Sequence, residues 1–347
     1  MKKSYLPSFF DPANAEKFHY NPDIQFLLEE AMEWKKAKKI KAAGAQIENI
    51  HLLLIDVQKD FCFPEGTLYV AGRSGDGAIQ DNVRIANFIY ENMELIKDIT
   101  TTMDTHFAFQ IFFPSFWLDK DGNKPAPHTI IATADILEGK FRPDPAIAWW
   151  LCNGNYAWLE KQVIHYTKEL EKAGKYSLYL WPPHCILGTD GHAVAGIVQE
   201  ARMFHNFVRG SQSLVEIKGG HPLTENYSVL GPEVLTRNDG GTLTQKNTLF
   251  IEKLIKNDIL IIAGQAASHC VKSTIDDLLT EINNKDPQLA RKVFILEDCM
   301  SSVTVPDGNG GFVMDFTDDS EAALKRFSDA GMNLIKSTDK LPDYIWL

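Results

Sequence analysis

The sequence predicts an α/β protein with three layers, in which helices cover both faces of a mostly parallel central sheet. Short, continuous apolar runs recur along the chain, and such runs are typical of strands that are buried on both faces. Segments with helical periodicity separate these runs, and this alternation is typical of parallel sheets. Several runs end in a charged residue, at the position where α/β sheets bind their ligands.

The individual elements follow from this alternation. The apolar runs predict strands at residues 51–55, 99–103, 214–217, 259–263 and 293–296. The amphipathic segments predict helices at residues 78–96, 193–206, 247–256, 268–283 and 320–330. Asp56, Asp104, Lys218 and Gly264 directly follow four of the strands. Because the carboxyl ends of parallel strands meet at one edge of a sheet, we expect these four residues to surround one site.

The chain divides into an extension and one large domain. Residues 1–48 form an N-terminal extension with a helical pattern at residues 24–40, and residues 49–347 form a single α/β domain. Residues from about 118 to 180 interrupt the alternation with a proline-containing loop and an aromatic-rich segment, so we interpret them as a long insertion. A lid beside the site, a structural element and an oligomerisation element are all compatible with this insertion.

Composition and charge exclude several classes of protein. Of the 347 residues, 44% are hydrophobic, which is enough for a large core. The formal net charge of -11 repels phosphate backbones and anionic lipids, so we expect neither nucleic-acid nor membrane partners. No stretch approaches the roughly 20 apolar residues that span a bilayer. Pro7, Asp11 and Pro12 interrupt any signal-like segment, so we expect a cytoplasmic protein.

One of the five cysteines is a candidate nucleophile. The cysteines are Cys62, Cys152, Cys185, Cys270 and Cys299, and they form no CxxC pair, so no zinc-ribbon or thioredoxin motif is present. Cys270 follows a small-residue turn after a predicted strand and is expected to open a helix. The positive end of a helix dipole favours a thiolate, and the free backbone N–H groups there can stabilise an oxyanion. A buried structural thiol is the alternative.

Asp56 and Lys218 are candidate partners of this cysteine. A thiolate nucleophile needs a base or a cationic neighbour. An aspartate whose pKa is raised by desolvation can accept the thiol proton, and a nearby lysine lowers the pKa of the thiol. A turn cap at position 56 and a surface charge at position 218 are the alternatives.

Asp104, His106 and His184 are candidate metal ligands. Side chains at alternate positions of an extended chain point the same way, so Asp104 and His106 can bind one ion. His184 follows two prolines that stiffen its backbone, which suits a ligand. Three ligands with open positions would make a catalytic site, whereas a closed shell would make a structural one. The histidines at positions 51, 128, 165, 192, 205, 221 and 269 are interpreted as structural.

Five segments together resemble the isochorismatase-like cysteine hydrolase superfamily and, within it, the nicotinamidase branch. They are Asp56-Val-Gln-Lys-Asp-Phe61, Asp104-Thr-His106, Trp181-Pro-Pro-His-Cys-Ile-Leu-Gly188, Lys218-Gly219 with Tyr227-Ser228, and the segment from Gly264 to Val271. Their order agrees with that of the superfamily. The residues before the cysteine differ, because nicotinamidases usually have Thr-Asp-Tyr where this chain has Ala267, Ser268 and His269.

The resemblance implies an isochorismatase-like hydrolase fold and gives each candidate residue a role. The catalytic triad is matched by Asp56, Lys218 and Cys270. The ligands of a divalent metal ion, for which Zn²⁺ is the first expectation, are matched by Asp104, His106 and His184. The oxyanion hole is matched by the backbone N–H groups of Ala266 and Cys270, and a cis peptide is expected around Gln265–Ala266. The substrate pocket is expected to include Phe61 and Tyr227.

The implied reaction is the hydrolysis of a small, nicotinamide-like carboxamide to an acid and ammonia. It proceeds through a thioester on the cysteine and is assisted by the metal. Hydrolysis of another small amide, ester or vinyl ether by the same triad is the first alternative. A binding or scaffold protein that has lost activity on this fold is an alternative of another class. The resemblance also implies a homo-oligomer.

Overall fold

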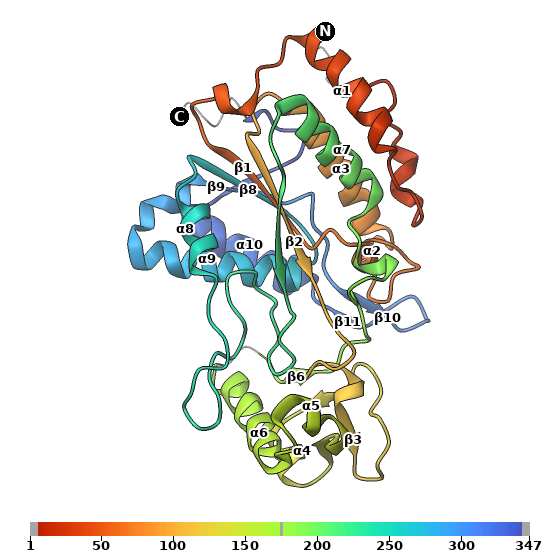
Figure 1. The fold of residues 1–347 in the computed structure, drawn as a ribbon, viewed down its shortest axis with the longest axis vertical. Helices are drawn as coiled ribbons and strands as arrows, with labels where there is room; N and C mark the ends of the chain where they lie inside the picture. Colours follow the sequence, from red (N-terminus) through yellow and green to blue (C-terminus); the bar gives the residue numbers. More distant parts are fainter. Residues whose placement is uncertain (1–5, 174–175, 342–347) are drawn as a thin grey trace.

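The chain has a central sheet with helices on both faces. The computed structural model describes residues 6–173 and 176–341. Residues 1–5 of the predicted extension, 174–175 of the predicted insertion and 342–347 of the predicted domain lie outside the described residues. One side of the sheet is covered by α1 (Ile24–Lys38), α3 (Gly77–Glu91) and α7 (Gly196–Arg209), and the other by α8 (Thr248–Ile255), α9 (Lys272–Lys285) and α10 (Thr317–Asp329) (Figure 1). This arrangement confirms the predicted three-layer α/β/α architecture.

Within the described residues, the sheet has six strands, and every neighbouring pair is parallel. They are β1 (Ile50–Ile55), β2 (Asp98–Asp104), β7 (Leu214–Lys218), β8 (Ile259–Gly264), β9 (Val293–Leu296) and β12 (Asn333–Ile335). Their order in the sheet is β12-β9-β8-β1-β2-β7. The five predicted strands are confirmed, whereas β12 was not predicted because its three residues form no recognisable apolar run.

Alternate residues of β1 explain the two helical layers. Leu52 and Leu54 pack into the apolar cluster that contains residues of α1, α3 and α7. Leu53 and Ile55 point to the opposite face and pack with residues of α8, α9 and α10. All four side chains are fully buried. A strand that is covered on both faces has no solvent-facing side for polar residues, which is why residues 52–55 of β1 are all apolar.

Some predicted helices have different ends in the structure. The helix predicted at residues 78–96 ends at Glu91, because the Asn92 side chain donates a hydrogen bond to the Phe88 carbonyl (2.9 Å) and closes the last turn. The helix predicted from residue 193 begins at Gly196. The helix predicted from residue 268 is preceded by a π-helical turn over Ala267–Val271 and starts at Lys272. Cys270 therefore lies inside this turn and does not open the α-helix.

Helix α1, which belongs to the predicted N-terminal extension, packs against α7. Asp23 caps α1 by accepting hydrogen bonds from the backbone N–H groups of Gln25 and Phe26. Leu27 and Ala31 of α1 are buried in the same apolar cluster as α7, with which α1 is in contact. In the described part of the chain, no helix combines the length and apolarity needed to cross a bilayer.

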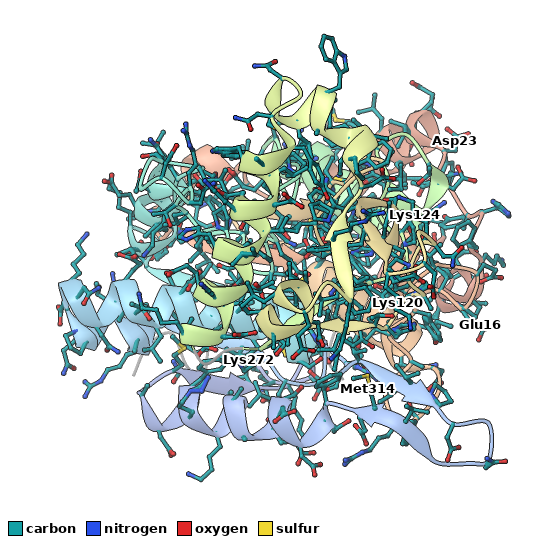
Figure 2. All side chains as sticks on the ribbon, turned by 90° about the horizontal axis from the view of Figure 1, so that it is seen from below. Glu16, Asp23, Lys120, Lys124, Lys272 and Met314 are labelled. Carbon is teal, nitrogen blue, oxygen red and sulfur yellow. The ribbon has the colours of Figure 1, made fainter. Side chains whose placement is uncertain are left out.

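The predicted insertion forms a lobe beyond the end of β2 (Figure 1). It consists of α4 (Thr133–Leu137), α5 (Ala148–Cys152), α6 (Tyr156–Lys172) and two antiparallel strand pairs, β3 (Trp117–Asp119) with β5 (Phe141–Pro143) and β4 (Ile130–Ile131) with β6 (Leu178–Tyr179). Figure 2 views this lobe, which includes Lys120 and Lys124, from below. Tyr179 donates a hydrogen bond to the sulfur of Met314 (3.1 Å), so the lobe contacts the hairpin of β10 (Thr304–Pro306) and β11 (Phe312–Asp315).

Candidate active site

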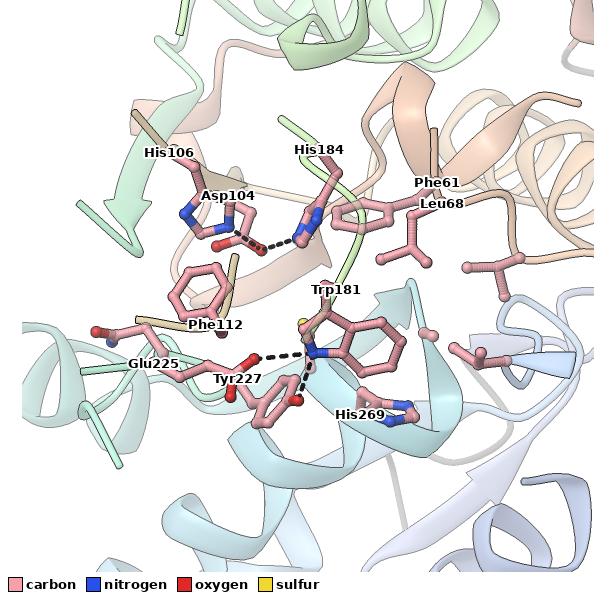
Figure 3. Close-up of a pocket in the computed structure, with 15 residues that line it drawn as sticks. Phe61, Leu68, Asp104, His106, Phe112, Trp181, His184, Glu225, Tyr227 and His269 are labelled. Carbon is pink, nitrogen blue, oxygen red and sulfur yellow. Dashed lines mark hydrogen bonds and ion pairs between the residues drawn. The ribbon is translucent and has the colours of Figure 1, made fainter. Parts of the chain in front are cut away.

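A pocket of about 450 Å³ lies at the carboxyl ends of the central strands. Asp104 at the end of β2 and Cys270 after β8 line it, together with residues 225–227 of the loop after β7. Figure 3 shows the Phe112 ring between Asp104 and Glu225, with Trp181 beside Tyr227. These two residues flank the insertion, whereas none of the described residues between 118 and 180 lines the pocket.

The structure brings Asp56, Lys218 and Cys270 together. Lys218 Nζ lies 2.9 Å from Asp56 Oδ2 and 3.6 Å from Cys270 Sγ. A carboxylate oxygen of Asp56 and the sulfur of Cys270 lie within 4.8 Å of each other. All three residues are buried. Lys218 therefore contacts two groups that are far from it in the sequence and that lie close to each other.

Neighbouring groups fix the orientation of Asp56 and Lys218. Thr102 Oγ1 donates a hydrogen bond to Asp56 Oδ1 (2.5 Å) and accepts one from the Asp56 backbone N–H (3.0 Å). Lys218 Nζ donates to the Asn226 carbonyl (2.9 Å) and lies 3.0 Å from Asp104 Oδ1. Lys218 therefore connects the candidate triad to the candidate metal ligands.

Burial and charge set the protonation of these groups. Burial raises the pKa of the Asp56 carboxyl, although Lys218 opposes this shift. Burial also raises the pKa of the Cys270 thiol well above its ordinary value. Burial alone would lower the pKa of Lys218, but the carboxylates of Asp104 and Asp56 hold it well above its usual range. The resting site thus has a neutral thiol beside an ammonium and a carboxylate that can accept the thiol proton.

Asp104, His106 and His184 form a buried cluster of possible metal ligands. One ligand atom from each residue lies within 4.8 Å of the other two. His106 Nδ1 contacts the Gly219 carbonyl (3.0 Å), and His184 Nδ1 contacts the Pro182 carbonyl (2.8 Å). Because a carbonyl oxygen only accepts hydrogen bonds, each Nδ1 carries the proton and each Nε2 keeps a free lone pair.

The two free lone pairs face the Asp104 carboxylate. His106 Nε2 lies 3.0 Å and His184 Nε2 lies 3.7 Å from Asp104 Oδ2. Burial lowers the pKa of His106, which keeps this imidazole neutral, and its Nε2 has no hydrogen-bond partner within the described chain. A lone pair and a carboxylate oxygen at such a distance repel each other unless a cation lies between them. One carboxylate and two imidazoles are a donor set that suits Zn²⁺, so these residues fit a divalent metal ion.

Two further residues, which belong to the five segments that resemble the superfamily, support this cluster. Gln58 Oε1 accepts a hydrogen bond from the Asp104 backbone N–H (2.7 Å), and Gln58 Nε2 donates one to the Asp104 carbonyl (2.8 Å). Gly219 has a φ of +83°, and a Cβ there would lie 2.5 Å from Cε1 of His106. Only glycine combines this backbone conformation with the space that the histidine needs.

The turn before Cys270 leaves one backbone donor free. The Gln265–Ala266 peptide is cis, as predicted. The backbone N–H of Gln265 donates to the Ile55 carbonyl (2.7 Å), and that of Ala267 donates to the Ser301 carbonyl (2.8 Å). Among the described residues, no acceptor faces the intervening N–H of Ala266. Ala266 lines the pocket, so its N–H is available to an oxyanion.

The two residues predicted for the substrate pocket, Phe61 and Tyr227, both line it. Phe61 lies in α2 (Lys59–Cys62), and its ring centroid is 5.4 Å from that of His184. The Tyr227 hydroxyl accepts a hydrogen bond from Trp181 Nε1 (2.8 Å). His269, which the sequence reasoning interpreted as structural, is also part of the pocket wall. Its ring packs edge-on against Trp181 at the turn that carries the cysteine.

Glu225 is a pocket residue that the sequence reasoning did not identify. Its Oε1 accepts a hydrogen bond from Trp181 Nε1 (3.0 Å), whereas its Oε2 has no hydrogen-bond partner in the described residues. Burial raises the pKa of this carboxyl well above its ordinary value. Glu225 lies in an irregular loop after β7, where no periodic pattern or motif marks a residue as functional.

Comparison with known proteins gives similarity in structure only. No family model matches the chain, and no curated protein matches it in sequence. The yeast nicotinamidase bound to the inhibitor nicotinaldehyde aligns with a TM-score of 0.50 and 16% identity, over 82% of this chain and 99% of that one. This chain has the nicotinamidase fold. A nicotinamidase and pyrazinamidase from Acinetobacter baumanii aligns with a TM-score of 0.49 and 20% identity, over 85% of this chain and 99% of that one.

Proposed function

We propose that the chain is an isochorismatase-like cysteine hydrolase that converts a small, nicotinamide-like carboxamide to its acid and ammonia. The observation that carries the proposal is the contact of the buried Lys218 ammonium with both Asp56 (2.9 Å) and Cys270 (3.6 Å). Buried charges are costly unless they are paired, and such a cluster beside a pocket is typical of catalysis. The fold shared with the yeast nicotinamidase supports the same class of substrate.

The reaction begins with the transfer of the Cys270 thiol proton to Asp56. Sulfur attacks the carboxamide carbon, and the carbonyl electron pair moves to oxygen, where the backbone N–H groups of Ala266 and Cys270 bind the oxyanion. Asp56 then gives the proton to the amide nitrogen, and ammonia leaves as the carbonyl re-forms in a thioester. Water attacks the thioester while Asp56 takes its proton, the carbon–sulfur bond then breaks to release the acid, and Asp56 returns the proton to the Cys270 sulfur. Throughout the reaction, Lys218 keeps the Asp56 carboxylate and the Cys270 sulfur in position through its contacts with both.

Asp104, His106 and His184 would hold the metal ion, with Zn²⁺ expected from their nitrogen and oxygen donors. When bound, the ion supplies a Lewis acid that can orient a ring nitrogen of the substrate. The protein prepares these ligands through Gln58, which binds both backbone groups of Asp104, and through the backbone carbonyls that set the proton of each histidine.

A different substrate on the same triad is the second candidate. The residues before the cysteine are Ala267, Ser268 and His269 in place of the usual Thr-Asp-Tyr, and His269 lies in the pocket wall. This difference favours testing other small amides, esters and vinyl ethers. An inactive scaffold is less favoured, because a scaffold gains nothing from three buried polar groups that destabilise its core. The homo-oligomer, the cytoplasmic location and the boundary between residues 48 and 49 stay predictions.

A substrate panel with purified protein tests the proposal. We expect ammonia release from nicotinamide or pyrazinamide and none from the Cys270→Ala variant, whose fold should be intact. Mass spectrometry during slow turnover should find the acyl adduct on Cys270. Hydrolysis of only an ester or vinyl ether would favour the second candidate. Full activity of Cys270→Ala, or an adduct on Cys185, would overturn the proposed mechanism.

A further inference from the structure

Three segments that are far apart in the sequence meet around the Ala266 amide. Asp81 Oδ2 accepts hydrogen bonds from Gln265 Nε2 (2.9 Å) and from Ser301 Oγ (2.6 Å). Gln265 Oε1 in turn accepts one from the Ser301 backbone N–H (3.3 Å). The Ser301 carbonyl accepts the N–H of Ala267 (2.8 Å). We call these bonds the Asp81–Gln265–Ser301 network. They hold the backbone in place on both sides of Ala266.

The amide and the carboxylate of the network are buried, whereas Ser301 is half-buried. Gln265 is 0% exposed and Asp81 is 1% exposed. Arg84 binds the second carboxylate oxygen of Asp81 at 2.7 Å. Gly77 leaves room for the serine, because a Cβ at that position would lie 2.4 Å from Ser301 Oγ. Apolar side chains of similar size could fill this space without the cost of burying an amide and a carboxylate, so stability alone is a weak reason for the network.

We propose that Asp81, Gln265 and Ser301 are positioning residues that hold the Ala266 N–H where the oxyanion develops. This inference rests on the proposed function, because an oxyanion arises only when Cys270 attacks a carbonyl. A backbone donor stabilises the transition state only if it is fixed in advance. A displacement of about 1 Å costs on the order of 100-fold in rate. The network therefore acts on the transition state and leaves the ground-state binding of substrate unchanged.

The test replaces Gln265 by methionine, which keeps the length of the side chain and removes both hydrogen bonds. Gln162→Met is the matched control, because Gln162 is also fully buried and hydrogen-bonded, to Asn238 in another part of the molecule. For Gln265→Met we expect kcat on nicotinamide to fall by about 10- to 100-fold, with KM within about threefold of the wild type. For Gln162→Met we expect kcat and KM close to the wild-type values.

A second variant covers the case in which Gln265→Met does not fold. Ser301→Ala removes only the hydroxyl that binds Asp81 and keeps the backbone bonds of residue 301. Its matched control is Ser302→Ala, which removes a buried hydroxyl that pairs with Ser320 (2.7 Å) and lies outside the network. We expect Ser301→Ala to lower kcat by about 3- to 10-fold, with KM unchanged, and Ser302→Ala to leave kcat near the wild-type value.

Inhibition by nicotinaldehyde distinguishes a displaced Ala266 N–H from a general loss of protein stability. The aldehyde carbon forms a bond with Cys270 sulfur, the thiol proton passes to Asp56, and the carbonyl electron pair moves to the oxygen that faces Ala266. Nicotinate resembles the bound product and forms no such bond. We therefore expect the nicotinaldehyde affinity of Gln265→Met and Ser301→Ala to fall by the same factor as kcat, with nicotinate affinity within about threefold of the wild type.

The outcomes distinguish this inference from the proposed function. If the wild type is active and the two network variants match their controls in kcat and nicotinaldehyde affinity, the inference is overturned and the proposed function stands. Equal losses of nicotinate and nicotinaldehyde affinity would also overturn it, because they indicate a general change of the pocket. A wild type that neither hydrolyses nicotinamide nor binds nicotinaldehyde would overturn both.

Discussion

Gly219→Ala is expected to disrupt the metal cluster without touching any of its ligands. Gly219 follows the candidate catalytic lysine, and its φ of +83° is one that side chains with a Cβ rarely adopt. An added Cβ would lie 2.5 Å from His106 Cε1 and 2.6 Å from Asp104 Oδ1, whereas ordinary contacts begin near 3.4 Å. Both candidate ligands must therefore move by about 1 Å, or the backbone must move away from them.

The expected size of the effect follows from these distances. The backbone conformation alone costs about 1–2 kcal/mol of folding free energy for a residue with a Cβ. The Gly219 carbonyl also accepts the Nδ1 proton of His106, so a backbone shift misorients the same imidazole. Loss of such a supporting contact typically lowers metal affinity by about 10- to 100-fold. We expect the variant to fold, with a lower melting temperature and at least a tenfold weaker affinity for Zn²⁺.

Metal content and a competition titration with a chelator measure this effect directly. Gly220→Ala is the matched control, because a Cβ there would meet Phe107 Cε2 at 3.6 Å and the Thr105 carbonyl oxygen at 3.9 Å, and both are ordinary contacts. The control should keep the metal content and melting temperature of the wild type. A Gly219→Ala protein that binds Zn²⁺ as tightly as Gly220→Ala would refute the reasoning. A wild type that binds no divalent ion would refute the metal site itself.

Two further predictions concern buried polar groups. Lys218→Met removes the ammonium that pairs with the Asp56 and Asp104 carboxylates. The free energy of unfolding should therefore fall by about 3–5 kcal/mol, and turnover should fall by at least about 100-fold. Unchanged denaturant midpoints and unchanged rates would contradict this prediction. His51 is 1% exposed, and neither ring nitrogen has a hydrogen-bond partner in the described chain, so His51→Leu should raise the free energy of unfolding by about 1–3 kcal/mol. Burial lowers the pKa of His51 from 6.5 to about 3, so below pH 6.5 the unfolded state binds a proton that the folded state does not. The free energy of unfolding should therefore fall by up to about 1.4 kcal/mol per pH unit as the pH is lowered from 6.5 toward 3. His51→Leu should remove this pH dependence, as measured by denaturation at several pH values. The same pH dependence in both proteins would contradict the lowered pKa of His51.

The parts of the protein that depend on local spacing were predictable from the sequence. Residues 52–55, 259–263 and 293–296 are continuously apolar and buried, so β1, β8 and β9 were recognisable without their neighbours. The expectation of a doubly buried apolar strand was wrong for β7, an edge strand that exposes Leu214, Val215 and Ile217, and β2 contains three buried threonines. Because parallel strands end at one edge of the sheet, the residues after these runs were expected to converge. Asp56, Lys218 and Cys270 do meet there, as do Asp104 and His106.

Other features depended on how irregular segments fold over that edge. Glu225 contacts Trp181 from an irregular loop that has no periodic pattern. The Asp81–Gln265–Ser301 network joins three segments that are far apart in the sequence. The π-helical turn around Cys270 is closed by Val271 donating to the Ala266 carbonyl (3.2 Å), a detail that the residue pattern of a helix does not encode. Local sequence determines the period of a strand or helix, because that period depends on neighbouring residues. Contacts between loops depend on the whole path of the chain, so only the tertiary structure decided them.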